Sequence, residues 1–337
     1  MEKIYFYPQF DYTKARSPNP YIVDFQRALS SHYTIINKKS NYIGVLDFFK
    51  YIFKTDIYLF NWIEDLPTLR FGNLQALVFL FFLLLCKILN KKIVWVLHNK
   101  YSHSIDKNFW TDFMYSFLMK HSDVILTHSQ SGISFGREYY PKQAHKINYI
   151  CHPINQLFSQ CWESKKKYDF LIWGSISQYK GILEFLQYVG KNRDLYKPRI
   201  LIVGKCIQES YKNQLKPFLS KDILMIDRYF EMEEITKLAN QSRFILFTHK
   251  ATSVLSSGTL IDSIRMQSRI IGPDIGAFKD LKALSCIETY EKYEDILEIN
   301  NRYLDVEKQI DPNELEKFYK ENNWEEFSNK IHELLKN

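Results

Sequence analysis

The sequence has no cysteines at the spacing of a metal or redox site. Its five cysteines, Cys86, Cys151, Cys161, Cys206 and Cys286, are scattered over 337 residues, and no Cys-x-x-Cys pair occurs. An odd number at such spacings indicates neither a zinc site nor a disulfide framework, and it fits a reducing cytosol. The first residues form only a short apolar stretch, typical of a β-strand rather than a signal peptide. We therefore expect a cytoplasmic protein.

Two motifs for nucleotide cofactors and metals are also missing. The turn after the first strand-like segment has no Gly-x-Gly-x-x-Gly pattern, which disfavours an NAD- or FAD-dependent oxidoreductase. No Asp-x-Asp motif is present anywhere in the chain. We predict neither a metal site nor a bound cofactor.

The longest apolar stretch is too short to cross a bilayer. Residues 76–86 are uninterrupted apolar residues, and the apolar character extends over 74–89, whereas a spanning helix needs about 20 residues. The simpler interpretation is a buried helix between two strands. The alternative is a peripheral membrane contact on the inner face of the cell membrane, in which Phe79, Phe81 and Phe82 insert into lipid beside flanking lysines.

Charge and composition indicate a globular protein with an anionic partner. The net charge is +7 and the sequence pI is about 8.9, with 46% hydrophobic and 25% charged residues. The basic excess is spread along the chain and forms no Lys/Arg tail, so we do not expect nucleic-acid binding. The length suffices for two domains with separate cores.

Strand-like runs alternate with helical stretches along the whole chain. This alternation predicts an α/β protein built from βαβ units with parallel sheets. About six runs fall in each half, which favours two Rossmann-like domains facing across a cleft, although an eight-stranded barrel is compatible with the spacing. We expect strands near residues 3–7, 33–37, 56–60, 92–97, 123–127, 147–151, 168–173, 199–203, 222–226, 243–248, 269–273 and 284–288.

A polar stretch and a helix start suggest the domain boundaries. Residues 159–167 include a run of three lysines and are the predicted linker, which gives domains 1–158 and 159–310. Near the C-terminus, Asp311 can cap a helix that has Pro312 in its first turn. We expect this helix, 311–337, to pack back on the first domain, with a kink at Asn322-Asn323.

Two strand–turn–helix segments in the second half carry the main functional prediction. The first, Asp169 to Ile182, includes Gly174, Ser175, Lys180 and Gly181. The second includes Ser257, Gly258 and Thr259 at the start of a helix. Unpaired N–H groups at a helix start favour a phosphate, and a lysine adds a point charge. Together the segments predict a site for a diphosphate-bearing ligand, although a single helix start of the second kind is more often an ordinary N-cap.

Other candidates lie at strand ends. Asp262, one turn into that helix, can accept hydrogen bonds from ribose hydroxyls or simply favour the helix dipole. Arg228, in Asp-Arg-Tyr-Phe after a strand, can add positive charge or be an ordinary surface residue. In the first half, His98 and Asn99 end a strand where α/β sheets bind ligands, and His103 follows in the next loop. His128-Ser129 ends another strand, and Ser129 is expected to cap the following helix.

These residues resemble the GT-B glycosyltransferases, near glycosyltransferase family 4 and the bacterial polysaccharide-assembly enzymes. The family's phosphate loop corresponds to Gly174–Gly181, with Lys180 in the lysine position. Asp262 falls where the family has a ribose-binding glutamate, and the resemblance places nucleobase contacts at Arg228 to Phe230. Asn19-Pro20-Tyr21 and Trp95 to Asn99 extend the resemblance into the first half. Ser175 stands where the family has an arginine, and Val254 where it has a first glutamate.

The resemblance implies a metal-independent glycosyltransferase of the hexosyltransferase type. Its substrates would be a UDP- or GDP-sugar and a saccharide acceptor, lipid-linked in bacterial surface polysaccharide or capsule synthesis. His98 and Asn99 would be catalytic, while His103 and Asn19 would bind the acceptor. The departures at Ser175 and Val254 motivate an alternative, a catalytically silent relative that acts as a membrane-associated sugar-binding or assembly partner.

Overall fold

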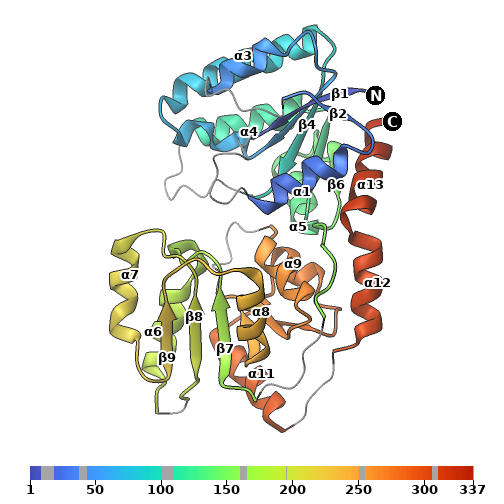
Figure 1. The fold of residues 1–337 in the computed structure, drawn as a ribbon. Helices are drawn as coiled ribbons and strands as arrows, with labels where there is room; N and C mark the ends of the chain where they lie inside the picture. Colours follow the sequence, from blue (N-terminus) through green and yellow to red (C-terminus); the bar gives the residue numbers. More distant parts are fainter. Residues whose placement is uncertain are drawn as a thin grey trace. The chain divides into compact units, whose positions relative to one another are not determined.

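The computed structural model describes residues 1–8, 19–37, 44–100, 109–159, 165–194, 196–249, 255–305 and 310–336. It divides the chain into two compact units. Unit 1 comprises Met1–Pro153 and Asn322–Asn337, and unit 2 comprises Ile154–Glu321. Each unit contains one six-stranded sheet, and every recorded strand pairing is parallel. The prediction of two Rossmann-like domains is confirmed, and the barrel is excluded (Figure 1).

The sheet of unit 1 has the strand order β2-β1-β3-β4-β5-β6. Its central strands are uninterrupted apolar runs because both of their faces are covered, as the fully buried Ile93 to Leu97 illustrate. The strands are β1 (Lys3–Tyr7), β2 (Thr34–Ile35), β3 (Ile57–Asn61), β4 (Lys92–Leu97), β5 (Val124–Thr127) and β6 (Ile147–Tyr149).

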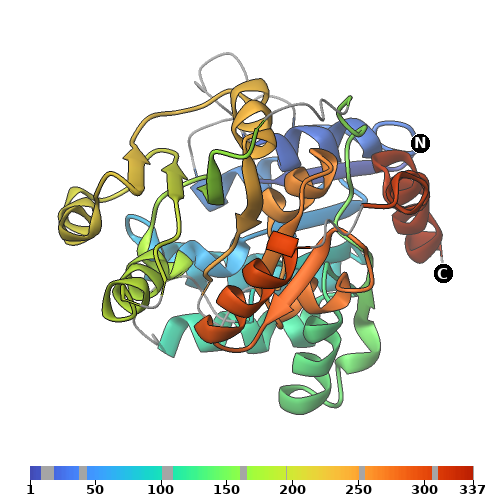
Figure 2. The same cartoon turned by 90° about the horizontal axis from the view of Figure 1, so that it is seen from below.

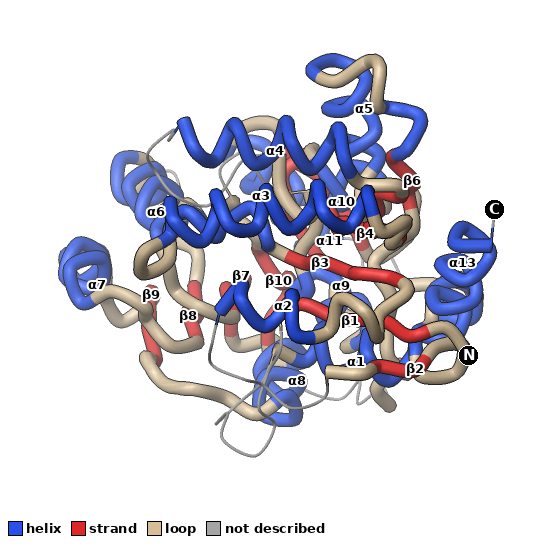
Figure 3. Tube along the Cα trace, turned by 90° about the horizontal axis from the view of Figure 1, so that it is seen from above, coloured by secondary structure: helices blue, strands red, loops and turns tan. Residues whose placement is uncertain are grey.

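Helices cover both faces of this sheet. On one face, α1 (Pro20–Leu29) and the C-terminal α13 (Trp324–Lys336) pack together and share a core with the strands. On the other face lie α2 (Asp47–Lys50), α3 (Gly72–Ile88) and α4 (Phe109–His121), which run side by side (Figure 3). The helix α5 (Gln130–Tyr139) connects β5 to β6.

The apolar stretch at 74–89 is largely α3, and two of its predicted lipid contacts are wrong. Phe79 and Phe82 are fully buried and meet Phe48 and other rings of the sheet face. Phe81 is instead exposed, because it lies on the opposite side of the helix. Among the described residues, no helix is long and apolar enough to cross a membrane.

The sheet of unit 2 has the strand order β12-β11-β10-β7-β8-β9. Eleven of the twelve predicted strands match within a few residues, but the predicted strand 284–288 lies at 287–290 instead. Leu284 and Ile287 form successive turns there, with Ile287 N–H donating to Leu284 C=O. The strands are β7 (Tyr168–Trp173), β8 (Ile200–Val203), β9 (Ile223–Ile226), β10 (Ser242–Leu246), β11 (Ile270–Pro273) and β12 (Ile287–Tyr290).

The helices of unit 2 follow these strands in the βαβ order. Apolar positions at helical spacing face the sheet, as Ile182, Phe185, Leu186 and Val189 do in the first helix. The helices are α6 (Ile182–Lys191), α7 (Glu209–Leu215), α8 (Met232–Asn240), α9 (Gly258–Arg265), α10 (Gly276–Asp280), α11 (Tyr293–Asp305) and α12 (Pro312–Asn322).

The boundary between the units falls at Pro153, before the predicted linker 159–167. Side chains at the end of α9 hold the intervening segment on unit 2. Arg265 donates from Nε to Gln156 C=O at 2.8 Å, and Gln267 donates from Nε2 to Phe158 C=O. The lysine run led to a predicted boundary at residue 159. The long-range hydrogen bonds instead hold residues 154–158 on unit 2.

The C-terminal region is two helices rather than one kinked helix. Asp311 accepts from Asn313 N–H and caps α12, as predicted. The chain then breaks at Asn323, whose Oδ1 accepts from Glu326 N–H at the start of α13. The division places nearly all of α12 in unit 2 and α13 in unit 1, where α13 lies beside α1 (Figure 2).

Candidate functional site

The turn between β7 and α6 has the backbone that its glycines allow. Gly174 has φ +98° and Gly181 has φ +67°, both in the left-handed region that disfavours other residues. Between them, Gln178–Lys180 forms one turn of 3₁₀ helix. This conformation returns Lys180 towards the end of β7, so the lysine and Gly174 come together across the turn.

Lys180 is almost completely buried although it carries a charge. Its side chain is 5% exposed, and Nζ donates to Trp173 C=O at 3.3 Å. Burial lowers the pKa of Lys180 to about 8, because the ammonium form loses hydration. Two residues after the end of β10, Thr248 donates through Oγ1 to Lys180 C=O at 2.7 Å and fixes the backbone at this residue. A buried ammonium group with few protein partners is suited to an anionic ligand.

The start of α9 meets this turn. A Cβ added at Gly174 would lie 2.8 Å from Lys180 Nζ and 3.1 Å from Thr259 Cγ2. The two elements are also tied by Trp173, which donates through Nε1 to Ser263 Oγ at 3.0 Å. The two glycine-bearing turns that we predicted to act together therefore converge within unit 2.

In the described part of the chain, no serine side chain caps the first backbone N–H groups of α9. The N-cap Ser257 makes no side-chain capping bond, and its Oγ lies 2.7 Å from Thr259 Oγ1 instead. A Cβ at Gly258 would meet nothing within 4 Å. The helix start therefore has space beside it and no serine oxygen occupying its first N–H groups, which suits an anion.

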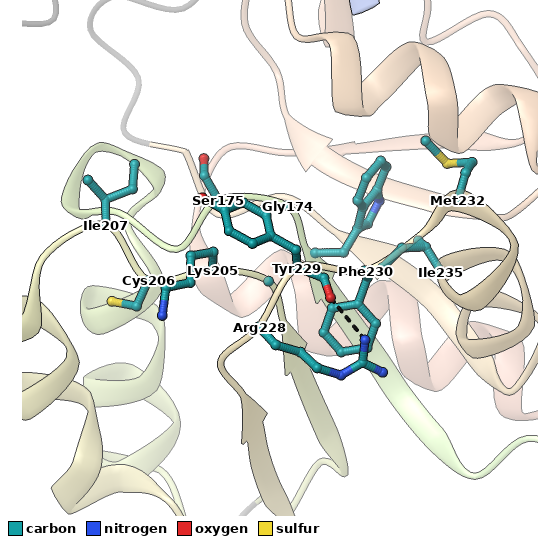
Figure 4. A pocket seen from close by; sticks show the side chains of 12 residues that line it. Gly174, Ser175, Lys205, Cys206, Ile207, Arg228, Tyr229, Phe230, Met232 and Ile235 are labelled. Atoms are coloured by element: carbon teal, nitrogen blue, oxygen red, sulfur yellow. Dashed lines mark hydrogen bonds between the residues drawn. The ribbon is translucent and has the colours of Figure 1, made fainter. Parts of the chain in front are cut away.

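A pocket of about 510 Å³ lies beside Gly174 (Figure 4). Three chain segments line it, and each follows the carboxyl end of a neighbouring strand: Trp173–Ser175 after β7, Gly204–Ile207 after β8, and Arg228–Phe230 after β9. Met232 and Ile235 of α8 complete the wall. This is the edge of a parallel sheet at which ligands usually bind.

Arg228 lies at the pocket, but its charge is balanced. Its guanidinium stacks over the Phe230 ring at 3.8 Å (Figure 4). It also forms a salt bridge with Glu234 at 2.6 Å. The pair holds the pKa of Glu234 well below its usual range. Both side chains are about half exposed, so the salt bridge adds little stability. Its effect is to position Tyr229 and Phe230.

Sequence reasoning missed the strand end after β8. Gly204 has φ +142°, and a Cβ there would overlap Gly174 C=O, so the two turns cross at backbone contact. Lys205 next to it pairs with Asp227 at 3.2 Å. Asp227 also accepts from Cys206 N–H, which ties the turns after β8 and β9 together. The signal was Val-Gly-Lys after an apolar run, the same pattern as Gly174 after β7.

Asp262 lies in the middle of α9, and its placement gives it a local partner. Its Oδ1 is 3.5 Å from Arg265 Nη1, one turn further along the helix. Arg265 also stacks over the Phe158 ring at 4.2 Å. The ribose contact predicted for Asp262 stays a prediction.

In unit 1, His98 and Asn99 follow β4 and are both buried. Asn61 donates from Nδ2 to Tyr7 C=O, so its Oδ1 faces His98 Nε2 at 3.0 Å as an acceptor. This assigns a proton to Nε2 of His98. Trp62 stacks on the imidazole ring at 4.2 Å and holds its plane. The Asn99 carbonyl accepts from Tyr115 Oη at 3.1 Å.

The other described candidate site residues of unit 1 form helix caps or buried hydrogen bonds within the unit. Ser129 caps α5 by accepting from Ser131 N–H, as predicted. His128 is bound between Tyr21 Oη at 2.7 Å and Ile150 C=O at 2.8 Å, and burial lowers its pKa to about 3. Asn19 caps α1 by accepting from Tyr21 N–H. His103 and Val254 lie outside the described residues.

Comparison with known proteins identifies the fold. No family model matches the chain, and no curated protein matches its sequence. HepE from Anabaena, solved with UDP-glucose, matches with a TM-score of 0.71 at 11% identity over 100% of both chains. An E. coli trehalose-6-phosphate protein bound to UDP-2-fluoro glucose gives 0.64 at 12% identity over 87% of this chain and 76% of that one.

The lipopolysaccharide outer core galactosyltransferase WaaB, in its apo form, gives a TM-score of 0.59 at 11% identity over 99% of both chains. In the part of the chain with a described structure, no group of three or more His, Cys, Asp or Glu side chains is arranged to hold a metal ion. With two parallel Rossmann-like sheets and these structural neighbours, the chain has the GT-B fold of glycosyltransferases.

Proposed function

We propose that this protein is a glycosyltransferase that transfers a sugar from a UDP- or GDP-sugar to a saccharide acceptor. The observation that carries the proposal is the buried Lys180 ammonium group beside Gly174 and the start of α9. A lysine at this place, with exposed N–H groups of a helix start, complements a diphosphate. Several structural neighbours were solved with UDP or UDP-glucose, which supports this donor class.

The nucleoside part of the donor fits the pocket beside Gly174. Tyr229 and Phe230 offer aromatic surface, and backbone groups after β8 offer hydrogen bonds to a base. The diphosphate would then run from this pocket past Gly174 to Lys180 and Thr259. Asp262 is the proposed ribose partner, which requires its carboxylate to turn away from Arg265.

Catalysis in this proposal is largely electrostatic. As the sugar leaves, negative charge grows on the diphosphate, and Lys180 with the N–H groups of α9 stabilises it. His98 is the proposed partner of the acceptor or donor sugar in unit 1.

The proposal also includes an acceptor class and a cellular location. We propose a saccharide, lipid-linked in bacterial surface polysaccharide synthesis, as the acceptor. We propose a cytoplasmic location at the inner face of the cell membrane, where nucleotide-sugars and lipid-linked saccharides meet. Cys86, Cys206 and Cys286 are free thiols, which is compatible with that compartment.

Substitution of Lys180 tests the proposal. In Lys180→Met, we expect UDP affinity to fall about 10- to 100-fold, because charge-assisted hydrogen bonds contribute about 1.5–3 kcal/mol. Stability to urea should stay equal or rise, since a desolvated charge is removed. Calorimetry with UDP and GDP measures the affinity and identifies the base. Lys191→Met, at the exposed end of α6, is the matched control.

Two results would contradict parts of the proposal. Unchanged nucleotide affinity in Lys180→Met would mean that the phosphate assignment is wrong. Nucleotide binding by the unmodified protein without sugar transfer or donor hydrolysis, across a broad donor panel, would favour a silent relative. The replacement of the family's loop arginine by Ser175 is the specific observation behind that second candidate.

A further inference from the structure

A continuous apolar stripe runs along the outer side of α3. It consists of Leu74, Leu77, Phe81, Leu84 and Ile88, whose exposed fractions lie between 43% and 76%. Successive members are separated by three, four, three and four residues, so they form one line along the helix. The other side of α3, with Ala76, Phe79, Leu83 and Cys86, is already buried against unit 1. The stripe is therefore not required for the core.

Neighbouring residues widen the stripe into a surface. The helix α4 packs beside α3 (Figure 3). On α4, Phe109 and Phe113 are exposed and their rings stack at 6.0 Å. Phe71, just before α3, is exposed as well. Both helices cover the same face of the sheet, so these groups lie on the outside of the same layer. Contiguous apolar surfaces of this extent mark interaction sites.

The charges around the stripe are basic. Between Gly72 and Ile88, α3 contains no acidic residue, and its one charged side chain is Lys87. Arg70 precedes the helix and Lys91 follows it. Three acids lie on neighbouring elements: Asp123, which pairs with Lys87, Asp112, which is exposed on α4, and Asp65, in the 3₁₀ helix Ile63–Thr68 that packs on α3. An anionic partner complements both ends of the stripe.

This charge pattern disfavours a second copy of the chain as the partner. The three- and four-residue spacing suits a helix–helix seam. However, a parallel pair would place Arg70 against Arg70 and Lys91 against Lys91. An antiparallel pair would place Arg70 against Lys91. Either orientation brings like charges together, and no acid on α3 offsets them.

We propose that α3 docks on an anionic lipid bilayer, lying in the plane of the membrane with the stripe inserted at the boundary of headgroups and acyl chains. The helix of 17 residues is about 25 Å long, which gives one line of five apolar side chains across the contact. Arg70 and Lys91 reach the anionic headgroups at its two ends. The inference rests on unit 1 alone and does not depend on the proposed donor site.

Flotation of the full chain with lipid vesicles tests this docking. We expect binding to vesicles of phosphatidylcholine containing phosphatidylglycerol, and much weaker binding to phosphatidylcholine alone. In the double variant Phe81→Ser/Leu84→Ser, affinity should fall roughly 100-fold, since two large apolar side chains no longer insert. In Arg70→Gln/Lys91→Gln, binding to the anionic vesicles should fall roughly 30-fold, because each charge near the surface contributes about fivefold.

The matched control is Tyr139→Ser/Leu224→Ser, which removes two apolar residues of similar exposure elsewhere. It should bind vesicles as the unmodified protein does. Circular dichroism and urea unfolding show whether each variant is folded. Equal vesicle binding by the stripe variant would overturn the proposal. So would an unmodified protein that ignores vesicles but forms a dimer that Phe81→Ser/Leu84→Ser dissociates.

Discussion

At the scale of single residues, Lys180 and Gly174 determine what the site can bind. Lys180 is buried because the turn that contains Gly174 and Gly181 folds it back on the end of β7. Its desolvation has a cost, which persists because the fold holds the residue from both sides through Trp173 and Thr248. A diphosphate would offset that cost by supplying the missing counter-charge.

The lowered pKa of Lys180 predicts a pH dependence of nucleotide affinity. The diphosphate of UDP is nearly fully ionised above about pH 7, so its own charge changes little at higher pH. With a pKa of about 8 in the free protein, Lys180 is charged below that pH and largely neutral at pH 9. We expect UDP affinity to fall about tenfold from pH 7 to pH 9. Calorimetry at several pH values measures it, and Lys180→Met should lack the fall.

The same group affects stability with the opposite sign. A lysine whose pKa is lower in the folded state binds fewer protons there than in the unfolded chain between about pH 8 and its ordinary value near 10.4. Stability therefore rises with pH across that window in the unmodified protein relative to Lys180→Met. A urea midpoint difference that stays constant from pH 7.5 to about 9.5 would contradict this assignment.

Substitution of Gly174 by alanine should damage both fold and binding. The new Cβ would require φ +98° and would lie 2.8 Å from Lys180 Nζ, so the lysine must move. We expect a loss of about 1–3 kcal/mol in the free energy of unfolding, with weaker UDP binding. Gly190→Ala is the control, because its Cβ meets only Phe218 at 3.8 Å within α6. It should be neutral or stabilising.

At the scale of elements, the helices differ in which group accepts hydrogen bonds from their first backbone N–H groups. Ser129 caps α5 in the ordinary way, whereas Ser257 bonds to Thr259 and leaves the first N–H groups of α9 without a serine cap. The strand end after β8 adds a second close approach, because Gly204 touches the backbone of Gly174. The uncapped start of α9 and the close turns after β7 and β8 therefore make this edge of the unit 2 sheet a candidate binding surface. The capped start of α5 has a structural role.

The two serines predict opposite effects of the same substitution. Ser129→Ala should lower the free energy of unfolding by about 1 kcal/mol, since it removes an N-cap, and should leave UDP affinity unchanged. Ser257→Ala should change stability much less and should weaken UDP binding. Urea unfolding and calorimetry on both variants provide the comparison. A stability loss in Ser257→Ala equal to that in Ser129→Ala would mean that Ser257 acts as an ordinary cap.

At the scale of the whole molecule, the chain returns to its first unit at the end. Phe327, Ile331 and Leu335 of α13 are buried in the core that α1 forms with the sheet of unit 1. His332 and Ser328 add hydrogen bonds to Tyr33 and Ala28. Unit 1 is therefore complete only when the last helix is in place, although more than 160 residues of unit 2 intervene.

Loss of the Phe327 side chain should destabilise unit 1 selectively. In Phe327→Ala, we expect unit 1 to lose about 3–5 kcal/mol of stability through the cavity left in its core. Hydrogen exchange should show faster opening of β1 and β3 with β7 and β10 unchanged, and UDP affinity should be kept. Faster exchange throughout both units would show instead that the units unfold as one.

The sequence determined more of this protein than its low identity to known structures suggests. Short apolar runs such as Ile93–Leu97 and Phe170–Trp173, which alternate with helical stretches, are typical of strands covered on both sides, so they predicted the parallel sheets. Glycines and a lysine after β7 predicted the phosphate turn, because few other residues allow φ above zero or add a compact charge. The helix caps at Ser129 and Asp311 could also be predicted, because each depends only on residues close by in the sequence.

The tertiary structure decided what local patterns cannot encode. Phe79 and Phe81 are equivalent in the sequence, and only packing on the sheet buries one and exposes the other. Hydrogen bonds from Arg265 and Gln267 set the domain boundary, and the crossing of Gly174 with Gly204 joins turns 30 residues apart. Each depends on contacts between distant segments, whose pairing is chosen by the buried surface of the whole fold rather than by any stretch of the chain.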